Sequence, residues 1–259
     1  MARKTSTWTV VRTERIARHM VRVVLGDPGF ETFEPSEFTD SYVKIEFGSG
    51  DDTVLRTYTV RSVDPVAREI AIDFVVHGDD GVAGPWAASV QPGATVTLRG
   101  PGGAYTPRAD ADWHLIAGDE SALPAISTAV AALAPDAVAR VFIEVADVDD
   151  EIALPAGPGV QVSWIHRGTT SDAAGEDISG TNAPLVSAVR AMPWLPGDVH
   201  VFIHGEADAV MHGLRPYIRK EHGVPAASAS ISGYWRRGRT EEGFRVWKSE
   251  LAAAEATAH

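Results

Sequence analysis

The sequence contains no cysteine, which excludes disulfide bonds, iron–sulfur clusters and thiolate zinc sites. Any redox chemistry would therefore depend on a bound organic cofactor. The chain also lacks an apolar run of about 18 residues, the length that a membrane-spanning helix needs. Its first residues contain no apolar block of the kind found in secretion signals. We therefore expect a cytoplasmic protein without membrane insertion.

Basic residues are few relative to acidic ones: 23 Lys and Arg stand against 35 Asp and Glu, which gives a net charge of −12. Nucleic acid and anionic membranes are therefore not expected as main partners, because an acidic protein is repelled by both. A local basic pocket is still compatible with this charge. The 259 residues are enough to form two hydrophobic cores, so we expect two domains.

Apolar and polar residues alternate through the first hundred positions, a period of two that is typical of half-buried β-strands. Six segments of similar length favour a small closed antiparallel barrel over an open sheet. The predicted strands are residues 8–16, 21–25, 43–47, 56–63, 70–76 and 94–99. One short helix is expected from Pro85, since proline suits the first turn of a helix and Gly93 lies beyond its end.

The pattern changes near residue 110, where apolar runs begin to alternate with helical segments. This alternation predicts a parallel sheet covered by helices. The predicted strands are residues 114–117, 141–145, 160–165, 199–203 and 229–231, and the predicted helices are residues 121–134, 183–192 and 206–221. We therefore divide the chain into a barrel domain at 1–108, an α/β domain at 112–239, and a C-terminal helix or tail at 240–259.

Two features indicate a dinucleotide ligand. Residues 112–124 are typical of a buried strand, a tight glycine turn and a helix start, an arrangement whose backbone amides can bind phosphate. Arg56 and Tyr58 lie two apart on a predicted strand, so a cation and an aromatic ring share one face. A dinucleotide requires a cation for its pyrophosphate and a flat ring for its heterocycle. No Gly-x-Gly-x-x-Gly motif is present.

Eight motifs follow one another in the order and spacing of the siderophore-interacting protein family, which the chain resembles from about Trp8 to Gly238. They are RTYT (56–59), DFVVHGDDG (73–81), GVAGPWA (81–87), LRGPGG (98–103), AGDESALPAI (117–126), WIHRG (164–168), HGEA (204–207) and SGYWRRG (232–238). The resemblance implies an FAD-binding barrel followed by a nicotinamide-binding α/β domain, as in the related ferredoxin reductases. It also implies the activity of a ferric-siderophore reductase.

For FAD, the resemblance implies that Arg56 pairs with the pyrophosphate, Tyr58 lies against the isoalloxazine ring and Thr59 lies near its N5 atom. A bidentate guanidinium suits a phosphate better than an ammonium group does. The alternative is that Arg56 forms a surface ion pair and Tyr58 belongs to the barrel core. The next strand adds three candidates that line the flavin, at alternate positions: Asp73, Val75 and His77.

The GVAGPWA segment departs from the family pattern, which has Gly-Pro-Ala-Ser before the tryptophan. Gly84 replaces the serine whose hydroxyl would bind the FAD phosphate. The backbone amides of Val82, Ala83 and Gly84 can still donate hydrogen bonds at the helix start. We therefore expect FAD binding to persist in a weakened form. The alternative is a simple strand-to-helix turn, for which Gly81 and Gly84 are sufficient.

Five residues of the second domain are implied to contact NADH or NADPH: Gly118, Ser121, Arg167, Gly205 and Glu206. Asp119 and Glu120 disfavour a tight grip on the pyrophosphate, so we expect modest affinity for nicotinamide. Three alternatives stay open. Ser121 is equally suited to cap the helix, Arg167 would be solvated in a loop, and Glu206 would be a favourable acid at the start of a helix.

The segment 234–239 concentrates three cations and two aromatic rings in an otherwise acidic chain. The resemblance implies that Arg236 and Arg239 join Lys44 in binding an anionic siderophore, and that Trp235 shields the flavin. The alternatives are a solvated charged loop and a tryptophan that packs between domains. We discount a metal site, because His200 and His204 are four apart on a predicted strand rather than a helix.

These observations predict a cytoplasmic FAD-dependent reductase that converts chelated Fe(III) to Fe(II). The predicted electron donor is NADH, NADPH or a ferredoxin-type protein, and the predicted substrate is a ferric siderophore. The cofactor performs the redox chemistry and the protein positions it. Two alternatives stay open: a flavin reductase for another acceptor, and a siderophore-binding or shuttle protein without turnover.

Overall fold

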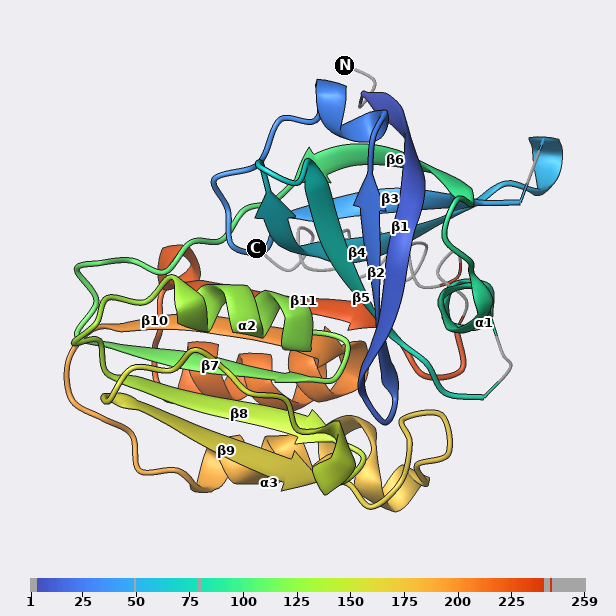
Figure 1. Ribbon diagram of the computed structural model, residues 1–259. Helices are drawn as coiled ribbons and strands as arrows, with labels where there is room; N and C mark the ends of the chain where they lie inside the picture. The colour runs from blue at the N-terminus through green and yellow to red at the C-terminus, as the bar shows by residue number, and fades with distance from the viewer. Residues whose placement is uncertain (1–3, 49, 79–80, 240–242, 244–259) are drawn as a thin grey trace.

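The computed structural model describes residues 4–48, 50–78, 81–239 and 243, and these residues form two stacked units (Figure 1). The first unit is a closed barrel of six antiparallel strands in the order β1-β2-β5-β4-β3-β6. The strands are β1 (Thr5–Ala17), β2 (Met20–Gly26), β3 (Tyr42–Phe47), β4 (Val54–Asp64), β5 (Glu69–Val75) and β6 (Thr95–Gly102). The barrel predicted from the period-two pattern is therefore confirmed.

Alternation is clearest in β3, whereas β2 and β5 are buried along nearly their whole length. In β3, Val43, Ile45 and Phe47 point inward and are buried, whereas Lys44 lies on the outer face. Helix α1 (Ala83–Ser89) covers one end of the barrel, where the Trp86 ring contacts the rings of Phe47 and Phe74 with centroids 5.4 and 5.5 Å apart. This helix lies where the sequence predicted it.

The second unit is a five-stranded parallel sheet in the order β11-β10-β7-β8-β9, as the alternation of strands and helices predicted. Its strands are β7 (Trp113–Asp119), β8 (Ala139–Val145), β9 (Val160–His166), β10 (Val199–Glu206) and β11 (Ala229–Trp235). One face is covered by α2 (Leu123–Ala131), and the other by α3 (Pro184–Ala191) together with the helical stretch 207–221.

The stretch 207–221 contains two π-helical segments, Ala209–Leu214 and Tyr217–Glu221. Short 3₁₀ turns complete the described elements: Gly29–Thr32, Gly50–Asp52, Val148–Asp150, Glu176–Ile178, Gly180–Asn182 and Ala226–Ser228. The barrel ends at Gly102 and the parallel sheet begins at Trp113. The domain division at 108–112 stays a prediction, and the predicted C-terminal helix or tail lies outside the described residues, apart from Gly243.

The two units are held together by the β1–β2 hairpin and by α2. Met20 of the hairpin is buried among the apolar residues of α2 and of the sheet. The Thr128 hydroxyl of α2 donates to the backbone oxygen of Thr39, 2.5 Å away. The crevice between the units therefore has fixed walls, formed by the barrel on one side and the carboxyl ends of the parallel strands on the other.

Candidate functional site

A cavity of about 290 Å³ lies between the barrel and the α/β domain. Twelve residues singled out from the sequence line it: Arg56, Tyr58, Asp73, Val75, His77, Val82, Ala83, Gly84, Ser121, Trp235, Arg236 and Arg239. Segments that are far apart in the chain therefore meet at one place. Thr59, Lys44, Gly118, Arg167, Gly205 and Glu206 do not line it.

Strand β4 supplies the cation and the ring predicted for the flavin. The half-buried Tyr58 packs its ring on Phe74, with centroids 4.3 Å apart, and also faces the cavity. It thus combines the cavity role with the barrel-core role that the sequence left as an alternative. Arg56, on the same strand face, donates from Nη1 to its neighbour's backbone oxygen at 3.0 Å.

Thr59 and Tyr234 connect the barrel to the last strand of the sheet. Thr59 is buried, and its hydroxyl is a hydrogen-bond partner of the Tyr234 phenol. Burial raises the pKa of Tyr234 well above its ordinary value. Because a neutral phenol both donates and accepts, this contact fixes the Tyr234 ring in the cavity wall.

Asp73 reaches the cavity from β5, but its carboxylate is occupied by an arginine of the neighbouring strand. Arg22 donates to both carboxylate oxygens, from Nε at 2.6 Å and from Nη2 at 2.8 Å. The Arg61 guanidinium lies 4.0 Å away on β4. The Asp73 side chain is thus a fixed part of the wall, flanked by two cations.

The turn before α1 explains the departure at Gly84. A Cβ atom at this position would lie 3.2 Å from the backbone oxygen of Val75, which is tighter than ordinary packing. A serine would therefore require α1 to move away from β5. Gly81 adopts a φ of +80°, which favours glycine. The first residues of α1 carry no side-chain cap, so backbone amides are what this turn offers to a ligand.

At the end of β7, Asp119 organises the turn that the sequence assigned to phosphate. Its Oδ1 accepts hydrogen bonds from the Ser121 amide at 2.9 Å and from the Ser121 hydroxyl at 2.5 Å. The N-cap residue of α2 is Ala122, without a side-chain hydrogen bond. The alternative that Ser121 caps the helix is therefore wrong, because its hydroxyl is bound to Asp119.

Gly118 is glycine for packing reasons. A Cβ atom there would lie 2.4 Å from the backbone oxygen of His204 and 2.7 Å from Ala122. Gly205, with a φ of +148°, similarly lets the Asp119 carboxylate approach the end of β10. Asp119 Oδ2 there accepts from the Glu206 amide at 2.7 Å and from Trp235 Nε1 at 2.9 Å. Asp119 therefore joins the ends of three strands.

Arg167 is buried rather than solvated, which corrects the loop alternative. Its guanidinium donates to Glu120 at 2.6 and 3.2 Å and to Glu144 at 2.6 Å. Burial raises the pKa of both carboxyl groups, and Asp119 adds to the effect at Glu120. The predicted contact of Arg167 with a ribose or 2′-phosphate stays untested, and two carboxylates already compete for this cation.

Glu206, the last residue of β10, is an acid at the start of the helical stretch 207–221, in agreement with the alternative drawn from the sequence. Its Oε2 accepts hydrogen bonds from the amides of Asp208 at 2.8 Å and Ala209 at 2.9 Å. Its other oxygen accepts from the Arg237 amide at 3.3 Å. Burial raises the pKa of Glu206.

The predicted basic group is divided between the cavity and its surroundings. Arg236 and the exposed Arg239 line the cavity. Arg237 turns away, since its guanidinium donates to the backbone oxygens of Ser171 and Asp172. Lys44 is outside the lining, but it lies directly opposite Thr57 in the β3–β4 pair, and Thr57 lines the cavity.

Within the described part of the chain, no group of three His, Asp or Glu side chains is placed to hold a metal ion. His200 and His204 are buried on β10, where His200 stacks on Tyr105 and His204 on Phe202. No helix among the described residues is long and apolar enough to cross a membrane.

Comparison with known proteins identifies the family. Residues 111–238 match the family model of siderophore-interacting proteins, and residues 46–105 match the siderophore-interacting FAD-binding domain. A siderophore utilization protein from T. fusca has a crystal structure that is 34% identical, with a TM-score of 0.78 over 93% of this chain and 95% of its own. The chain belongs to the siderophore-interacting protein family.

Two relatives of this siderophore-interacting protein illustrate the range of similarity. A Mycobacterium tuberculosis protein described as uncharacterized is 58% identical over 273 residues, which covers 96% of each chain. The ferric vibriobactin reductase ViuB of Vibrio cholerae is 29% identical over 255 residues and 90% of each chain. The resemblance expected from the motifs is confirmed, and the barrel carries the FAD-binding domain of the family.

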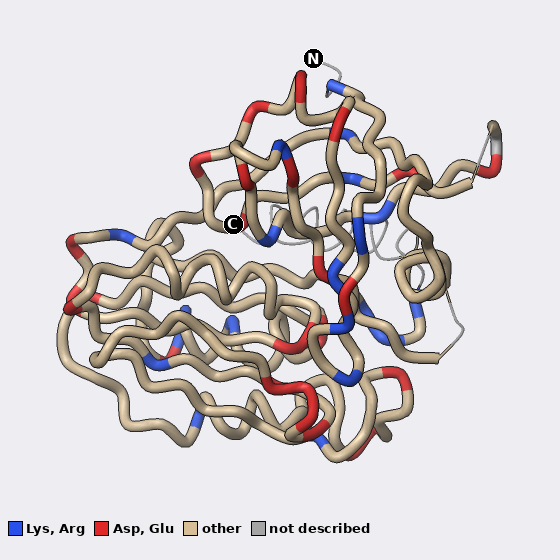
Figure 2. The backbone as a smooth tube through the Cα atoms, viewed as in Figure 1, with Lys and Arg blue, Asp and Glu red and all other residues tan. Residues whose placement is uncertain are grey.

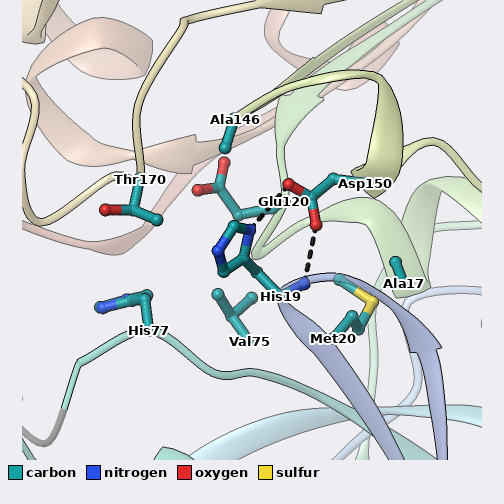
Figure 3. Close-up of a pocket in the computed structure, with 9 residues that line it drawn as sticks. All are labelled: Ala17, His19, Met20, Val75, His77, Glu120, Ala146, Asp150 and Thr170. Carbon is teal, nitrogen blue, oxygen red and sulfur yellow. Dashed lines mark hydrogen bonds and ion pairs between the residues drawn. The ribbon is translucent and has the colours of Figure 1, made fainter.

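The siderophore-interacting protein also has a small cavity, of about 10 Å³, at the junction of its domains (Figure 3). His19 of the barrel faces Glu120 and Asp150 of the α/β domain there, whereas His77, also in the lining, pairs with Asp172 at 3.3 Å. Asp150 accepts from the His19 backbone amide and pairs with its Nδ1, both at 2.8 Å. Sequence reasoning missed this contact, because the residues are 131 positions apart and belong to no motif.

Proposed function

We propose that this protein is an FAD-dependent reductase of ferric siderophores that releases iron as Fe(II) in the cytoplasm. One observation carries the proposal: a single cavity is lined both by Arg56 and Tyr58 of β4, the residues expected to bind flavin, and by the cations Arg236 and Arg239. The cofactor contacts and the substrate contacts would then share one space. Membership of the family and the similarity to ferric vibriobactin reductase support this reading.

The lining of the cavity fits FAD. Arg56 would donate charge-assisted hydrogen bonds to the pyrophosphate. Tyr58, held on Phe74, would lie against the isoalloxazine ring. Thr59 does not line the cavity, so its place near the N5 atom stays a prediction of the family resemblance. Asp73, Val75, His77 and the turn Val82 to Gly84 would complete the wall. When bound, FAD supplies the electron transfer that these side chains cannot perform.

On the substrate side, Arg236 and Arg239 would attract an anionic ferric chelate, and Lys44 would add to the attraction from the neighbouring strand. The remainder of the chain is acidic and would repel an anionic chelate, so these cations would direct the chelate to the cavity. Reduction would release the metal, because hard oxygen ligands hold Fe(III) more tightly than Fe(II). Metal reduction requires no proton transfer, and we assign no general acid.

The electron donor would be reduced nicotinamide or a ferredoxin-type protein. Anaerobic stopped-flow absorbance would compare NADH, NADPH and reduced ferredoxin as donors to the FAD-loaded protein, with one ferric siderophore present. Flavin bleaching by a donor, followed by recovery of the yellow colour as Fe(II) appears, supports the proposal. Bleaching without Fe(II) would indicate a reductase for another acceptor. Siderophore binding without bleaching by any donor would indicate a shuttle protein.

A further inference from the structure

The carboxyl edge of a parallel sheet is where α/β domains ordinarily bind dinucleotides, because helices begin there and their first amides bind the pyrophosphate. In this protein, α2, α3 and the helical stretch 207–221 begin at that edge. At the starts of α3 and of the stretch 207–221, a carboxylate of the chain itself accepts hydrogen bonds from the first amides. In the turn before α2, Asp119 accepts from Ser121, which precedes the N-cap residue Ala122. The contacts are Asp119 from Ser121 N (2.9 Å), Glu144 from Leu185 N (2.8 Å), and Glu206 from Asp208 N and Ala209 N (2.8 and 2.9 Å).

The space and the charge at this edge also oppose a diphosphate. The cavity bounded by Asp119, Glu144, Arg167 and Glu206 measures about 20 Å³, a volume with room for about one water molecule. Arg167, a buried cation beside these acids, is already shared by Glu120 and Glu144. Acidic residues follow the ends of β7 and β8, drawn in red in Figure 2. A pyrophosphate would meet carboxylates where other α/β domains present free amides.

We propose that this edge binds no dinucleotide, and that reduced nicotinamide is recognised by its ring end alone in the cavity beside Tyr234 and Trp235. The ring would lose one hydride, that is two electrons and one proton, to bound FAD and leave as oxidised nicotinamide. The ADP half of NADH or NADPH would contribute no affinity. This inference rests on the proposed function and replaces the nicotinamide contacts expected at Gly118, Arg167, Gly205 and Glu206.

The first test measures binding alone. FAD-loaded protein is titrated calorimetrically with ADP-ribose, which carries the ADP half and lacks the nicotinamide ring. The dissociation constant for ADP-ribose is expected to be above about 1 mM. A tighter value overturns the proposal. Because no turnover is involved, a protein that binds FAD but reduces no ferric siderophore would fail the proposed function without changing this result.

The second test compares rates. Anaerobic stopped-flow measures the second-order rate constant for flavin reduction by NADH and by reduced nicotinamide mononucleotide, which lacks the AMP portion of NADH. The two constants should agree within about tenfold, the equivalent of 1.4 kcal/mol. An advantage of NADH above tenfold would show that the adenosine half is recognised, and would overturn the proposal.

A pair of variants tests the cause. Glu206→Ala leaves the amides of Asp208 and Ala209 without their carboxylate, and should bring the dissociation constant of ADP-ribose below about 1 mM. Glu176→Ala removes the same charge from an exposed residue of a 3₁₀ turn and should leave the binding of ADP-ribose unchanged. If both variants behave alike, Glu206 does not exclude the diphosphate and its part of the proposal is wrong. If Glu206→Ala does not fold, the ADP-ribose titration and the rate comparison on the unaltered protein still test the proposal.

Discussion

Replacing Arg167 with methionine should destabilise the protein strongly, because the charge that is removed is buried. The side chains of Arg167, Glu120 and Glu144 are 4, 12 and 5% exposed, and three hydrogen bonds of 2.6–3.2 Å join them. Removing the cation leaves two buried carboxylates without a charged partner. Breaking a buried ion pair in this way costs about 3–5 kcal/mol. At about 2–4 °C per kcal/mol, the melting temperature should fall by roughly 6–20 °C.

The pH dependence provides a second check. Burial already raises the pKa of both Glu120 and Glu144, and loss of Arg167 raises it further. A carboxyl group with a raised pKa in the folded state keeps its proton where the unfolded chain has lost it, so stability falls as the pH rises. The loss of stability in the variant should therefore be larger at about pH 8 than at about pH 5.5.

Thermal unfolding followed by circular dichroism measures both effects, with Arg190→Met as the matched control. Arg190 pairs with Glu221 at 2.9 Å, but the two side chains are 41 and 52% exposed. An exposed pair of this kind contributes at most about 1 kcal/mol. The reasoning is refuted if Arg167→Met melts within about 3 °C of the unaltered protein, or if its loss of stability is the same at both pH values.

Three further predictions follow from the site. Arg56→Ala should weaken FAD binding about tenfold or more, since a charge-assisted contact contributes roughly 1.5–3 kcal/mol; an absorbance titration with FAD that shows equal affinity contradicts this. Neutralising Lys44, Arg236 and Arg239 together should raise KM for anionic ferric siderophores and remove its dependence on salt, while neutral hydroxamate chelates serve as the control; unchanged kinetics would make the group a solvated loop. Asp150→Ala should lower the free energy of unfolding by about 1–3 kcal/mol, because the His19 amide loses its acceptor; urea unfolding with an unchanged midpoint would refute the domain contact.

The fold was predictable because its signals are local. Alternating burial in β3 is visible in the sequence as Val, Ile and Phe at alternate positions. The strand–helix alternation after residue 110 likewise requires only neighbouring residues. Arg56 and Trp235, which both line the cavity between the domains, could be predicted from motifs, although the sequence alone did not show that they meet.

The electrostatics of the sheet edge could not be predicted, because the partners are distant in sequence. Arg167 lies 47 residues from Glu120 and 23 residues from Glu144, so a loop arginine gave no sign of burial. Serine is a residue type that often caps helices, but the Ser121 hydroxyl donates to Asp119, two positions earlier. In both cases the side chain binds a carboxylate: Arg167 binds Glu120 and Glu144 instead of solvent, and Ser121 binds Asp119 instead of a helix amide. These partners are visible only in the folded chain.

Single-turnover iron reduction is the most direct test of the proposed reduction of ferric siderophores by this protein. FAD-loaded protein is reduced anaerobically, freed of excess reductant, and mixed with a ferric siderophore and an Fe(II)-specific chelator. Two Fe(II) should form per protein molecule, because reduced FAD carries two electrons. The double variant Arg236→Gln with Arg239→Gln should lower the rate for an anionic chelate but not for a neutral one. Reduced protein that keeps its electrons and forms no Fe(II) would contradict the proposal that this chain is a ferric-siderophore reductase.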